Sequence, residues 1–341
     1  SRPTPTARLL PVVLDELLAG GIKPENIAIV IAGGTHMPAS ANENVKKTGG
    51  NLPSGVRVMA HNCHRELVDL GRTARGTPIQ INQQVLESDL KIGIGCIYPH
   101  QLAGFSGGAK ILVPGAAGFE TIRALHDNML GSKGRAGSIQ NQFRDEVEDI
   151  VTRVGLDFIV NVTLNQKRDI TAVFAGDRIQ AFNAGVEYAK EVYAVETYPN
   201  ADVIIVDMYP FDISYQVASG RGFWPFQSAH KESSKILLAG CPEGLSSHDL
   251  FSVSDHVFDK VKHRIKNLRL SHLLTLGARF RTLQGMLLMK KMNVIVLSET
   301  LGEEDLKKAL PGGKVVTLWE KLLDVLVHKH GKNSKTTVAI Y

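Results

Sequence analysis

The sequence predicts an α/β protein with two Rossmann-like domains. Apolar runs of strand length alternate with segments of helical periodicity along most of the chain, and several of these runs end in glycine turns. A fresh apolar run of the buried-strand type begins just after Tyr198-Pro199. Alternating strands and helices favour sheets covered by helices, with ligand sites between domains. We therefore expect an N-terminal α/β domain at residues 1–197 with a closing strand at 333–341, a C-terminal α/β domain at 198–332, and a cofactor and substrate cleft between them.

The composition is typical of a soluble globular protein. Of the 341 residues 43% are hydrophobic and 21% charged, and no apolar run reaches the roughly 18 residues that a membrane span needs. The net charge is +5, but the lysines and arginines are scattered along the chain, and aromatic residues make up only 6%. This pattern argues against binding of nucleic acid and suits a small anionic ligand better. Cys63, Cys96 and Cys241 give no disulfide framework, so we expect a reducing, cytoplasmic setting. The start at Ser1, without methionine or signal peptide, is typical of a sequence that begins inside a longer chain.

The first domain is expected to open with a helix and a buried strand. Prolines hold residues 2–6 extended, and residues 7–18 have apolar positions at helical spacing before a Gly-Gly stop. The apolar run at 27–34 predicts a strand buried on both faces, with Thr35 and His36 on the turn at its carboxyl end. Open α/β sheets bind ligands at that end of their strands, so His36 is a candidate functional residue.

The remaining elements follow from the same two periodicities. Residues 77–82 alternate in polarity like a β-ribbon at a sheet edge, and strands at 157–164 and 168–175 are expected to pair around a turn. Helices are expected at 120–130, at 141–154 and from just after Gly176 to about Val195. Further strands are expected at 55–60, 90–97, 201–210, from 235 onward, at 293–299 and at 314–319.

The loop at residues 98–118, YPHQLAGFSGGAKILVPGAAG, follows the strand expected at 90–97 and is the strongest candidate for a ligand-binding site. His100, Ser106 and Lys110 offer a base, a hydroxyl and an amine within a short stretch. A loop that leaves the carboxyl end of a buried strand lies where α/β sheets bind their ligands. The sequence therefore indicates a binding loop here.

Glycines give this loop its second feature. Gly104, Gly107 and Gly108 allow a ligand to approach the backbone where a Cβ would clash. The loop is not a nucleotide-binding P-loop, because Lys110 is followed by Ile111 where that motif has serine or threonine. The ILVPG segment that follows is compatible with a short strand or a buried turn.

The contiguous stretch YPHQLAGFSGGAKILVPG resembles the signature of the nickel-pincer-nucleotide-dependent lactate racemase family. Members carry H-x-x-A-G-F-S-G-G-x-K, then a proline-glycine turn and a further histidine. The resemblance covers nearly the whole chain and is strongest at residues 27–128. It implies a nickel pincer nucleotide, pyridinium-3-thioamide-5-thiocarboxylic acid mononucleotide, attached covalently through Lys110, with His126 as the nickel ligand.

The resemblance also implies a racemase or epimerase of a 2-hydroxy acid. In the family a histidine takes the hydroxyl proton while the C2 hydride moves to the cofactor, and the 2-keto acid then accepts the hydride on its other face. His36 and His100 match the two catalytic histidines, and Arg2 matches the arginine that binds the substrate carboxylate. The other matched positions are the cofactor-binding residues Ser106, Gly107, Gly108 and Tyr215, and Gln216, which binds cofactor and substrate.

Two positions depart from the family pattern. Ser219 stands where the family has a lysine that grips the substrate carboxylate, and Arg221 is a nearby substitute cation for substrate binding. The tryptophan that the family places near residues 279–281 is absent. We therefore expect a 2-hydroxy acid other than lactate, or larger than it.

Other interpretations remain open. The same departures suit a family member that binds the cofactor, or a different one, without racemase activity. A nicotinamide-dependent dehydrogenase is disfavoured, because no G-x-G-x-x-G with an acidic residue about twenty positions on follows a strand. His61 and His64 flank Cys63, but no second ligand pair at zinc-finger spacing accompanies them. The family further implies partner proteins that make and insert the cofactor.

Overall fold

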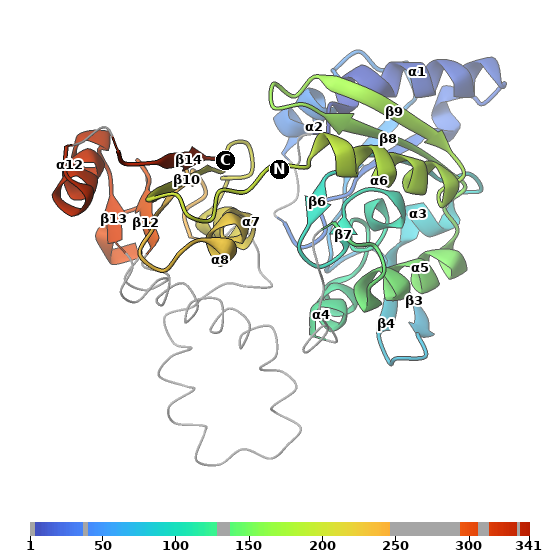
Figure 1. Cartoon of the computed structure of the whole chain (residues 1–341). Helices are drawn as coiled ribbons and strands as arrows, with labels where there is room; N and C mark the ends of the chain where they lie inside the picture. The colour runs from blue at the N-terminus through green and yellow to red at the C-terminus, as the bar shows by residue number, and fades with distance from the viewer. Residues whose placement is uncertain (1–3, 37–39, 128–136, 246–293, 306–313, 333–334) are drawn as a thin grey trace. The chain divides into compact units, whose positions relative to one another are not determined.

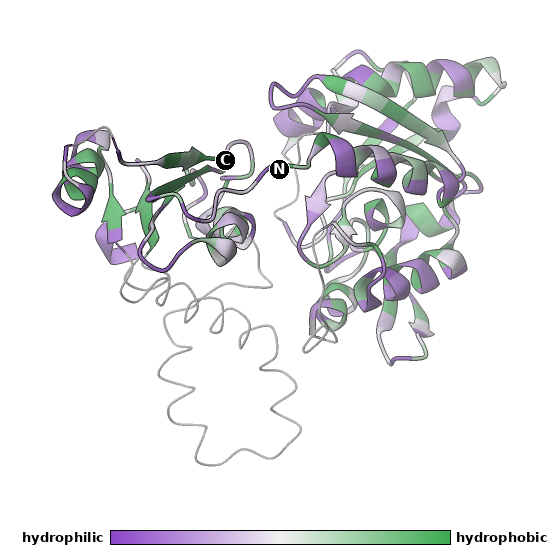
Figure 2. Cartoon of the chain, in the orientation of Figure 1, coloured by the Kyte–Doolittle hydropathy of each residue, from purple (hydrophilic) through white to green (hydrophobic). Residues whose placement is uncertain are grey.

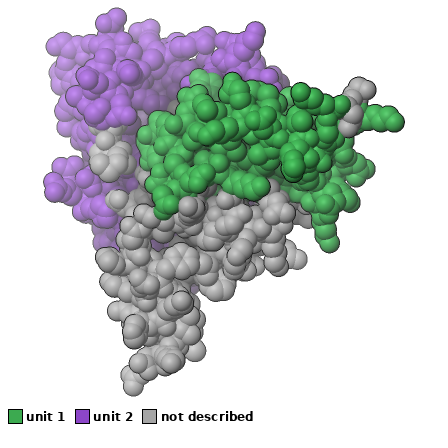
Figure 3. Space-filling view, turned by 90° about the vertical axis from the view of Figure 1, so that its left-hand side faces the viewer, with its two compact units in different colours: residues 1–2, 195–341 green, residues 3–194 purple. Residues whose placement is uncertain are grey.

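The chain forms two compact units (Figures 1 and 3). The N-terminal one, which ends at Ala194 and is purple in Figure 3, is called the first unit in the text, and the one that runs from Val195 to Tyr341 and is green in Figure 3 is called the second unit. The computed structural model describes residues 4–36, 40–127, 137–245, 294–305, 314–332 and 335–341. Both units combine helices with parallel strand pairs, so the α/β fold class is confirmed. Among the described residues, no helix combines the length and the apolar character needed to cross a membrane.

The first unit contains several small sheets with helices packed between and over them. Helix α6 packs on β8 and β9, and α1 contacts β5. The strands are β1 (Ala28–Ile31) parallel to β2 (Arg57–Ala60), β3 (Leu67–Arg72) antiparallel to β4 (Pro78–Asn82), β5 (Ile92–Cys96) parallel to β8 (Phe158–Leu164), β8 antiparallel to β9 (Ile170–Gly176), and β6 (Pro99–His100) antiparallel to β7 (Gly104–Phe105). The helices are α1 (Thr6–Ala19), α2 (Ala41–Thr48), α3 (Gln83–Glu87), α4 (Phe119–Asp127), α5 (Gln142–Val154), α6 (Gln180–Val192) and the 3-10 turns η1 (Pro24–Asn26) and η2 (Gly108–Ile111).

Most of the expected elements of this unit are found close to their predicted bounds, with a few differences. The strand predicted at 27–34 is shorter, and its four residues are half-buried rather than buried on both faces. The predicted ribbon exists, but β3 and β4 form a two-stranded sheet of their own rather than the edge of a larger one. In ILVPG, Ile111 is the last residue of η2 and residues 112–115 form a turn, so the strand alternative is wrong. The last residues of the helix predicted at 120–130 lie outside the described part of the chain.

The second unit is built on one parallel sheet with the strand order β13-β12-β11-β10-β14. Its apolar side chains alternate between two core clusters, because successive strand residues point to opposite faces. Val203 and Ile205 pack with Leu322 of α12, whereas Ile204 and Val206 pack with residues of α7 and α8. Figure 1 shows α12 on one side of the sheet and α7 and α8 on the other, and Figure 2 shows hydrophobic colour along the strands between them. The elements are β10 (Val203–Asp207), α7 (Tyr215–Gly222), α8 (Trp224–Ser228), β11 (Ser234–Leu238), β12 (Val294–Leu297), β13 (Lys314–Val316), α12 (Trp319–His330) and β14 (Val338–Ile340).

The C-terminal strand corrects one expectation. The segment 333–341 was expected to close the first domain, but β14 pairs in parallel with β10 inside the second unit's sheet. The strand order therefore reverses beside β10, with β11 on one side and β14 on the other. Ligands of doubly wound sheets bind at the carboxyl ends of strands at such a reversal. The residues that follow β10 are thus in a favourable place for a binding site.

Candidate active site

The binding loop is fixed to the end of β5 by Ser106. This side chain is 1% exposed, and its hydroxyl lies 2.8 Å from the carbonyl oxygen of Cys96. The hydroxyl also accepts the backbone N–H of Tyr98 at 3.2 Å, and the Ser106 N–H donates to the Tyr98 carbonyl. Ser106 therefore holds the loop on the strand, and its expected contact with a cofactor stays a prediction.

His100 lies in β6, at the start of a tight turn to β7. The backbone N–H groups of Leu102 and Ala103 both donate to its Nδ1, each at 3.2 Å. An imidazole nitrogen that accepts hydrogen bonds carries a lone pair and no proton. The neutral ring of His100 therefore has its proton on Nε2.

The loop glycines are required by the packing of the chain itself. Gly104, Gly107 and Gly108 all have positive φ, and a Cβ at these positions would lie 1.9 Å from the Ser138 carbonyl oxygen, 2.4 Å from Asn161 Oδ1 and 2.8 Å from the Phe182 ring, respectively. The expectation that these glycines leave room for a ligand is corrected in this respect, because protein atoms already occupy the space. Their effect is to let the loop pack tightly, with Lys110 in η2 only 5% exposed.

A buried arginine that was not predicted from the sequence supports the binding loop by hydrogen bonds to its backbone. Arg144 of α5 is 5% exposed, and its guanidinium donates to the carbonyl oxygens of Phe105 and Gly107. The guanidinium lies 4.4 Å from the centroid of the Phe182 ring and 3.8 Å from a carboxylate oxygen of Glu148. Burial lowers the pKa of Arg144 to about 10, against the opposing effect of Glu148.

Asn161 of β8 is a second supporting residue. It is fully buried, and its Oδ1 accepts the N–H of Gly108 at 2.8 Å. Its Nδ2, like the Nε of Arg144, has no hydrogen-bond partner among the described residues. Two sequence signals could have indicated these two supporting residues. The apolar run of β8 contains a polar residue, and the apolar positions of α5 include a cation.

The turn that carries His36 is joined to the same loop. The N–H of Gly34 donates to the carbonyl oxygen of Gly115 at 2.9 Å, and a Cβ at Gly34 would lie 3.3 Å from the Pro114 carbonyl oxygen. His36 follows two residues later, is half-buried, and donates its backbone N–H to Gly33. The structure thus connects the carboxyl end of β1 directly to the loop that carries His100 and Lys110.

His126 lies on α4, the helix that starts where the loop ends. Its Nδ1 is 2.7 Å from the carbonyl oxygen of Ile122, and its ring packs edge-on against Phe143. A carbonyl oxygen can only accept, so Nδ1 carries the proton and Nε2 keeps a lone pair. Histidines that bind metals characteristically donate their second ring N–H to such a carbonyl. His126 is therefore held in the tautomer that a metal ligand requires.

The histidines near Cys63 have structural contacts. His61 is 1% exposed and donates from Nε2 to the Ala117 carbonyl at 2.9 Å, while its Nδ1 lies 3.4 Å from the amide nitrogen of Asn82. Burial lowers the pKa of His61. The His64 ring stacks on Phe119. Among the described residues, no three His, Cys, Asp or Glu side chains are grouped so that they could hold a metal ion by themselves.

The remaining candidates lie in the second unit or outside the described residues. Tyr215 begins α7, and its ring is part of the apolar core, where burial raises its pKa. Arg221, on the same helix, lies 4.5 Å from the centroid of the Phe211 ring, in the loop after β10. Gln216 is in α7 by its backbone, and Arg2 lies outside the described residues.

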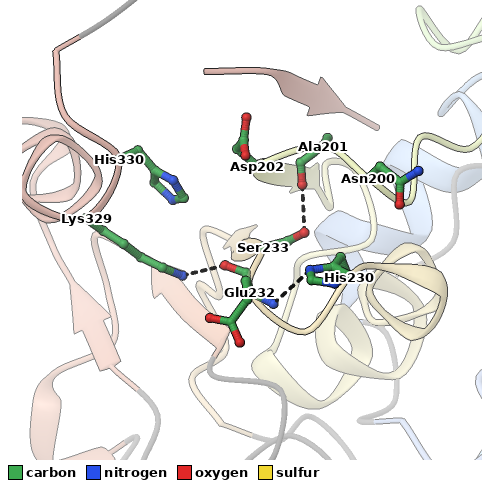
Figure 4. Close-up of a pocket in the computed structure, with 8 residues that line it drawn as sticks. All are labelled: Asn200, Ala201, Asp202, His230, Glu232, Ser233, Lys329 and His330. Carbon is green, nitrogen blue, oxygen red and sulfur yellow. Dashed lines mark hydrogen bonds between the residues drawn. The ribbon is translucent and has the colours of Figure 1, made fainter. Parts of the chain in front are cut away.

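A polar pocket of about 210 Å³ lies beside the amino ends of β10 and β11 in the second unit's sheet (Figure 4). It is lined by residues that precede β10 and β11 and by the end of α12. Lys329 donates to the Glu232 carbonyl, and Ser233 donates to the Ala201 carbonyl. The amino ends of strands β10 and β11 face this pocket, so it is distinct from the edge where ligands of such sheets bind.

Comparisons with known proteins agree with the resemblance seen in the sequence. Residues 1–137 match the family described as the lactate racemase N-terminal domain. Lactate racemase of Lactiplantibacillus plantarum is 30% identical over 269 residues, which cover 75% of this chain and 62% of that protein. Lactate racemase of Thermoanaerobacterium thermosaccharolyticum is 32% identical over 254 residues, which cover 72% and 58%. The chain thus spans less than two thirds of the length of the curated relatives it matches.

Solved structures share the fold. The lactate racemase apoprotein from Thermoanaerobacterium thermosaccharolyticum superposes with a TM-score of 0.77 at 22% identity, covering 99% of this chain and 82% of that one. A crystal structure of a protein from Thermotoga maritima superposes with a TM-score of 0.65 at 16% identity, covering 95% and 85%. At these identities the likeness concerns the fold alone.

Proposed function

Because the chain belongs to the lactate racemase family through its N-terminal domain, we propose that it is an isomerase that racemises or epimerises a 2-hydroxy acid. The observation that carries the proposal is the connected framework around the binding loop. One buried loop holds His100 and Lys110, it is hydrogen-bonded to the turn before His36, and it leads into the helix of His126. These are the residue types that the reaction needs.

The cofactor we propose is a nickel pincer nucleotide bound covalently through Lys110. A relative in the family is known as an apoprotein, a form that lacks its cofactor. One feature of this chain fits such a group. His126 keeps a lone pair on Nε2, and imidazole is a good nickel ligand. When bound, this cofactor supplies an acceptor for the substrate's C2 hydride and a source for its return.

The protein's own part in the reaction is the handling of the hydroxyl proton. His36 and His100 are the histidines we propose for this task, since imidazole can accept and return a proton near neutral pH. Arg144 and Asn161 keep the loop rigid during this proton transfer. Arg144 donates to the carbonyl oxygens of Phe105 and Gly107, and Asn161 accepts the backbone N–H of Gly108.

The second unit is proposed to help hold the substrate. Gln216 and Arg221 follow the strand-order reversal at β10, and Arg2 is the proposed carboxylate-binding residue before the first helix. Ser219 is buried on α7. Residues two positions apart on a helix point about 200° apart, so Arg221 does not take the place of a lysine at 219 and offers its charge beside Phe211 instead. A carboxylate clamp changed in this way favours an acid other than lactate.

Proteins that assemble and insert the cofactor are the proposed partners. The cytoplasm, where cysteines stay reduced, is the proposed location. The alternative is a member that carries the cofactor without racemase activity, which the serine at position 219 favours.

The test is to produce the protein together with the cofactor pathway and incubate it with enantiopure lactate, malate, phenyllactate and sugar acids. Chiral chromatography should show the opposite configuration appearing at C2 of at least one acid, and the Lys110→Ala variant should show none. Loaded protein that leaves every acid unchanged would refute racemase activity and favour the alternative.

A further inference from the structure

Helix α12 is apolar on two sides, and the sheet of the second unit covers one of them. The side that packs on the strands is formed by three residues, Leu322, Val325 and Leu326. Trp319, Leu323 and Val327 lie on another side of the helix and are 36–43% exposed. Residues four apart on a helix lie one above the other on the same face. These three side chains therefore form one apolar stripe along the helix, which we call the α12 stripe.

Strand β14 adds exposed apolar side chains on the same side of the sheet. Val338 pairs with Val203, and Ile340 pairs with Ile205. Paired residues of neighbouring strands point to the same face of a sheet, and Val203 and Ile205 are residues that pack with α12. Val338 and Ile340 are both more than half exposed. The side of the sheet that carries α12 thus has exposed apolar surface on its helix and on its edge strand.

The charged residues beside the α12 stripe change sign along the helix. Glu320 and Asp324 are exposed in the first half of α12. His328 is exposed near the end of the helix, and Lys332 is exposed just after it. An exposed apolar patch with a polar rim marks a surface that binds a partner. A membrane surface favours cations along the whole polar side of such a helix, so the two carboxylates favour a protein partner.

The order of these charges makes α12 complementary to a second α12 that runs in the opposite direction. The acidic first half of each helix then lies beside the basic end of the other, and the two helix dipoles are antiparallel. Leu323, in the middle of the stripe, lies at the two-fold axis, and the large Trp319 of one helix faces the smaller Val327 of the other. A two-fold interface requires a self-complementary surface of this kind.

We propose that the α12 stripe is the interface of a two-fold symmetric homodimer, in which α12 packs antiparallel on α12 of a second copy of this chain. Val338 and Ile340 extend the apolar surface on the same side of the sheet. An interface built on one helix from each copy is smaller than the roughly 1,200 Å² at which standard interfaces begin. We therefore expect a dissociation constant on the order of 1–100 µM. This assembly does not depend on the enzymatic activity.

Sedimentation velocity of the wild-type chain across this concentration range tests the proposal. The mass should rise from 37.1 kDa toward twice that value. Leu323→Asp should weaken association by about a hundredfold or more, because the two-fold axis brings both new carboxylates together in an apolar contact. The matched control is Val12→Asp, which makes the same kind of change at an exposed position of α1 in the first unit and should leave the dimer intact. Circular dichroism should show that both variants fold, since both positions are exposed.

Charge substitutions test the antiparallel arrangement. Glu320→Lys combined with Asp324→Lys makes the rim of α12 basic, and His328→Glu combined with Lys332→Glu makes it acidic. Each double variant alone should associate roughly threefold to tenfold more weakly than the wild type, because like charges then face each other. An equimolar mixture of the two should associate at least as strongly as the wild type, because opposite charges face each other in the mixed dimer.

Trp319 reports whether the stripe itself is covered. In the Trp224→Phe variant Trp319 is the sole tryptophan, and its emission maximum should move to longer wavelength on dilution as the ring becomes exposed to water. An emission maximum that is independent of concentration while the mass doubles would place the interface elsewhere and overturn the proposal.

Two further outcomes would overturn it. A dimer that Leu323→Asp leaves unchanged does not use the α12 stripe. A wild-type chain that keeps the monomer mass throughout the range is not a dimer, and binding of that monomer to phosphatidylserine vesicles would identify a lipid surface as the occupant instead.

Discussion

Arg144 provides the sharpest test of how the binding loop is held. Replacing it with methionine keeps much of the side-chain volume but removes the donors to the Phe105 and Gly107 carbonyls. Each buried carbonyl left without a donor costs on the order of 1–3 kcal/mol. Glu148 is not stranded, because it also pairs with Arg178, and removing a buried charge offsets part of the loss. We therefore expect the first unit to lose about 2–4 kcal/mol of unfolding free energy.

Arg153→Met on the same helix is the matched control. Its ion pair with Asp149 has both side chains more than 40% exposed, and such pairs contribute roughly 0.2–1 kcal/mol. Urea unfolding followed by far-UV circular dichroism reports both units, whereas tryptophan fluorescence reports only the second, since Trp224 and Trp319 both lie there. Arg144→Met should shift the circular dichroism transition to lower urea. An equal effect of the two substitutions would refute the buried role of Arg144.

Three further predictions follow from the site and its surroundings. Below about pH 6.5 the first unit should lose stability, because burial lowers the pKa of His61 and the unfolded chain then binds a proton that the folded chain does not. The contribution of His61 to stability is complete above that pH and is lost as the pH falls. His61→Gln should therefore make the unfolding free energy depend less on pH. If urea melts at pH 7.5 and 5.5 gave the same pH dependence for His61→Gln and the wild type, the argument would be wrong. His126→Ala in protein made with the cofactor pathway should hold at least tenfold less nickel by elemental analysis, and undiminished nickel would remove the ligand role. Lactate should turn over more slowly than a larger 2-hydroxy acid in the stereochemical assay, and lactate as the fastest substrate would show that Ser219 does not set specificity.

The alternation of strand and helix made much of the fold predictable, and the errors have local causes. Helix α2 was missed although Ser40 and Glu43 form a complete capping box, a signal visible in the sequence as S-x-x-E. β3 was missed because its exposed half has no apolar alternation. The destination of β14 was beyond reach, because which strand a terminal segment joins depends on contacts distant in sequence, here with β10.

For the candidate site, the loop and the histidines could be proposed from the sequence, but the tautomers of those histidines could not. The tautomers of His100 and His126 depend on whether a backbone donor or a backbone acceptor faces Nδ1, which only coordinates reveal. Gly107 was interpreted as space for a ligand, whereas Asn161 fills that space from another strand.

The covalent attachment at Lys110 is the central claim, and intact mass tests it most directly. Protein produced together with the cofactor pathway should be heavier than the sequence mass of its 341 residues, 37.1 kDa, by one cofactor, and peptide mapping should locate the addition on Lys110. The Lys110→Ala variant made in the same way should have its sequence mass. An unmodified wild-type mass under conditions where the cofactor is made, or the same addition on Lys110→Ala, would contradict the account.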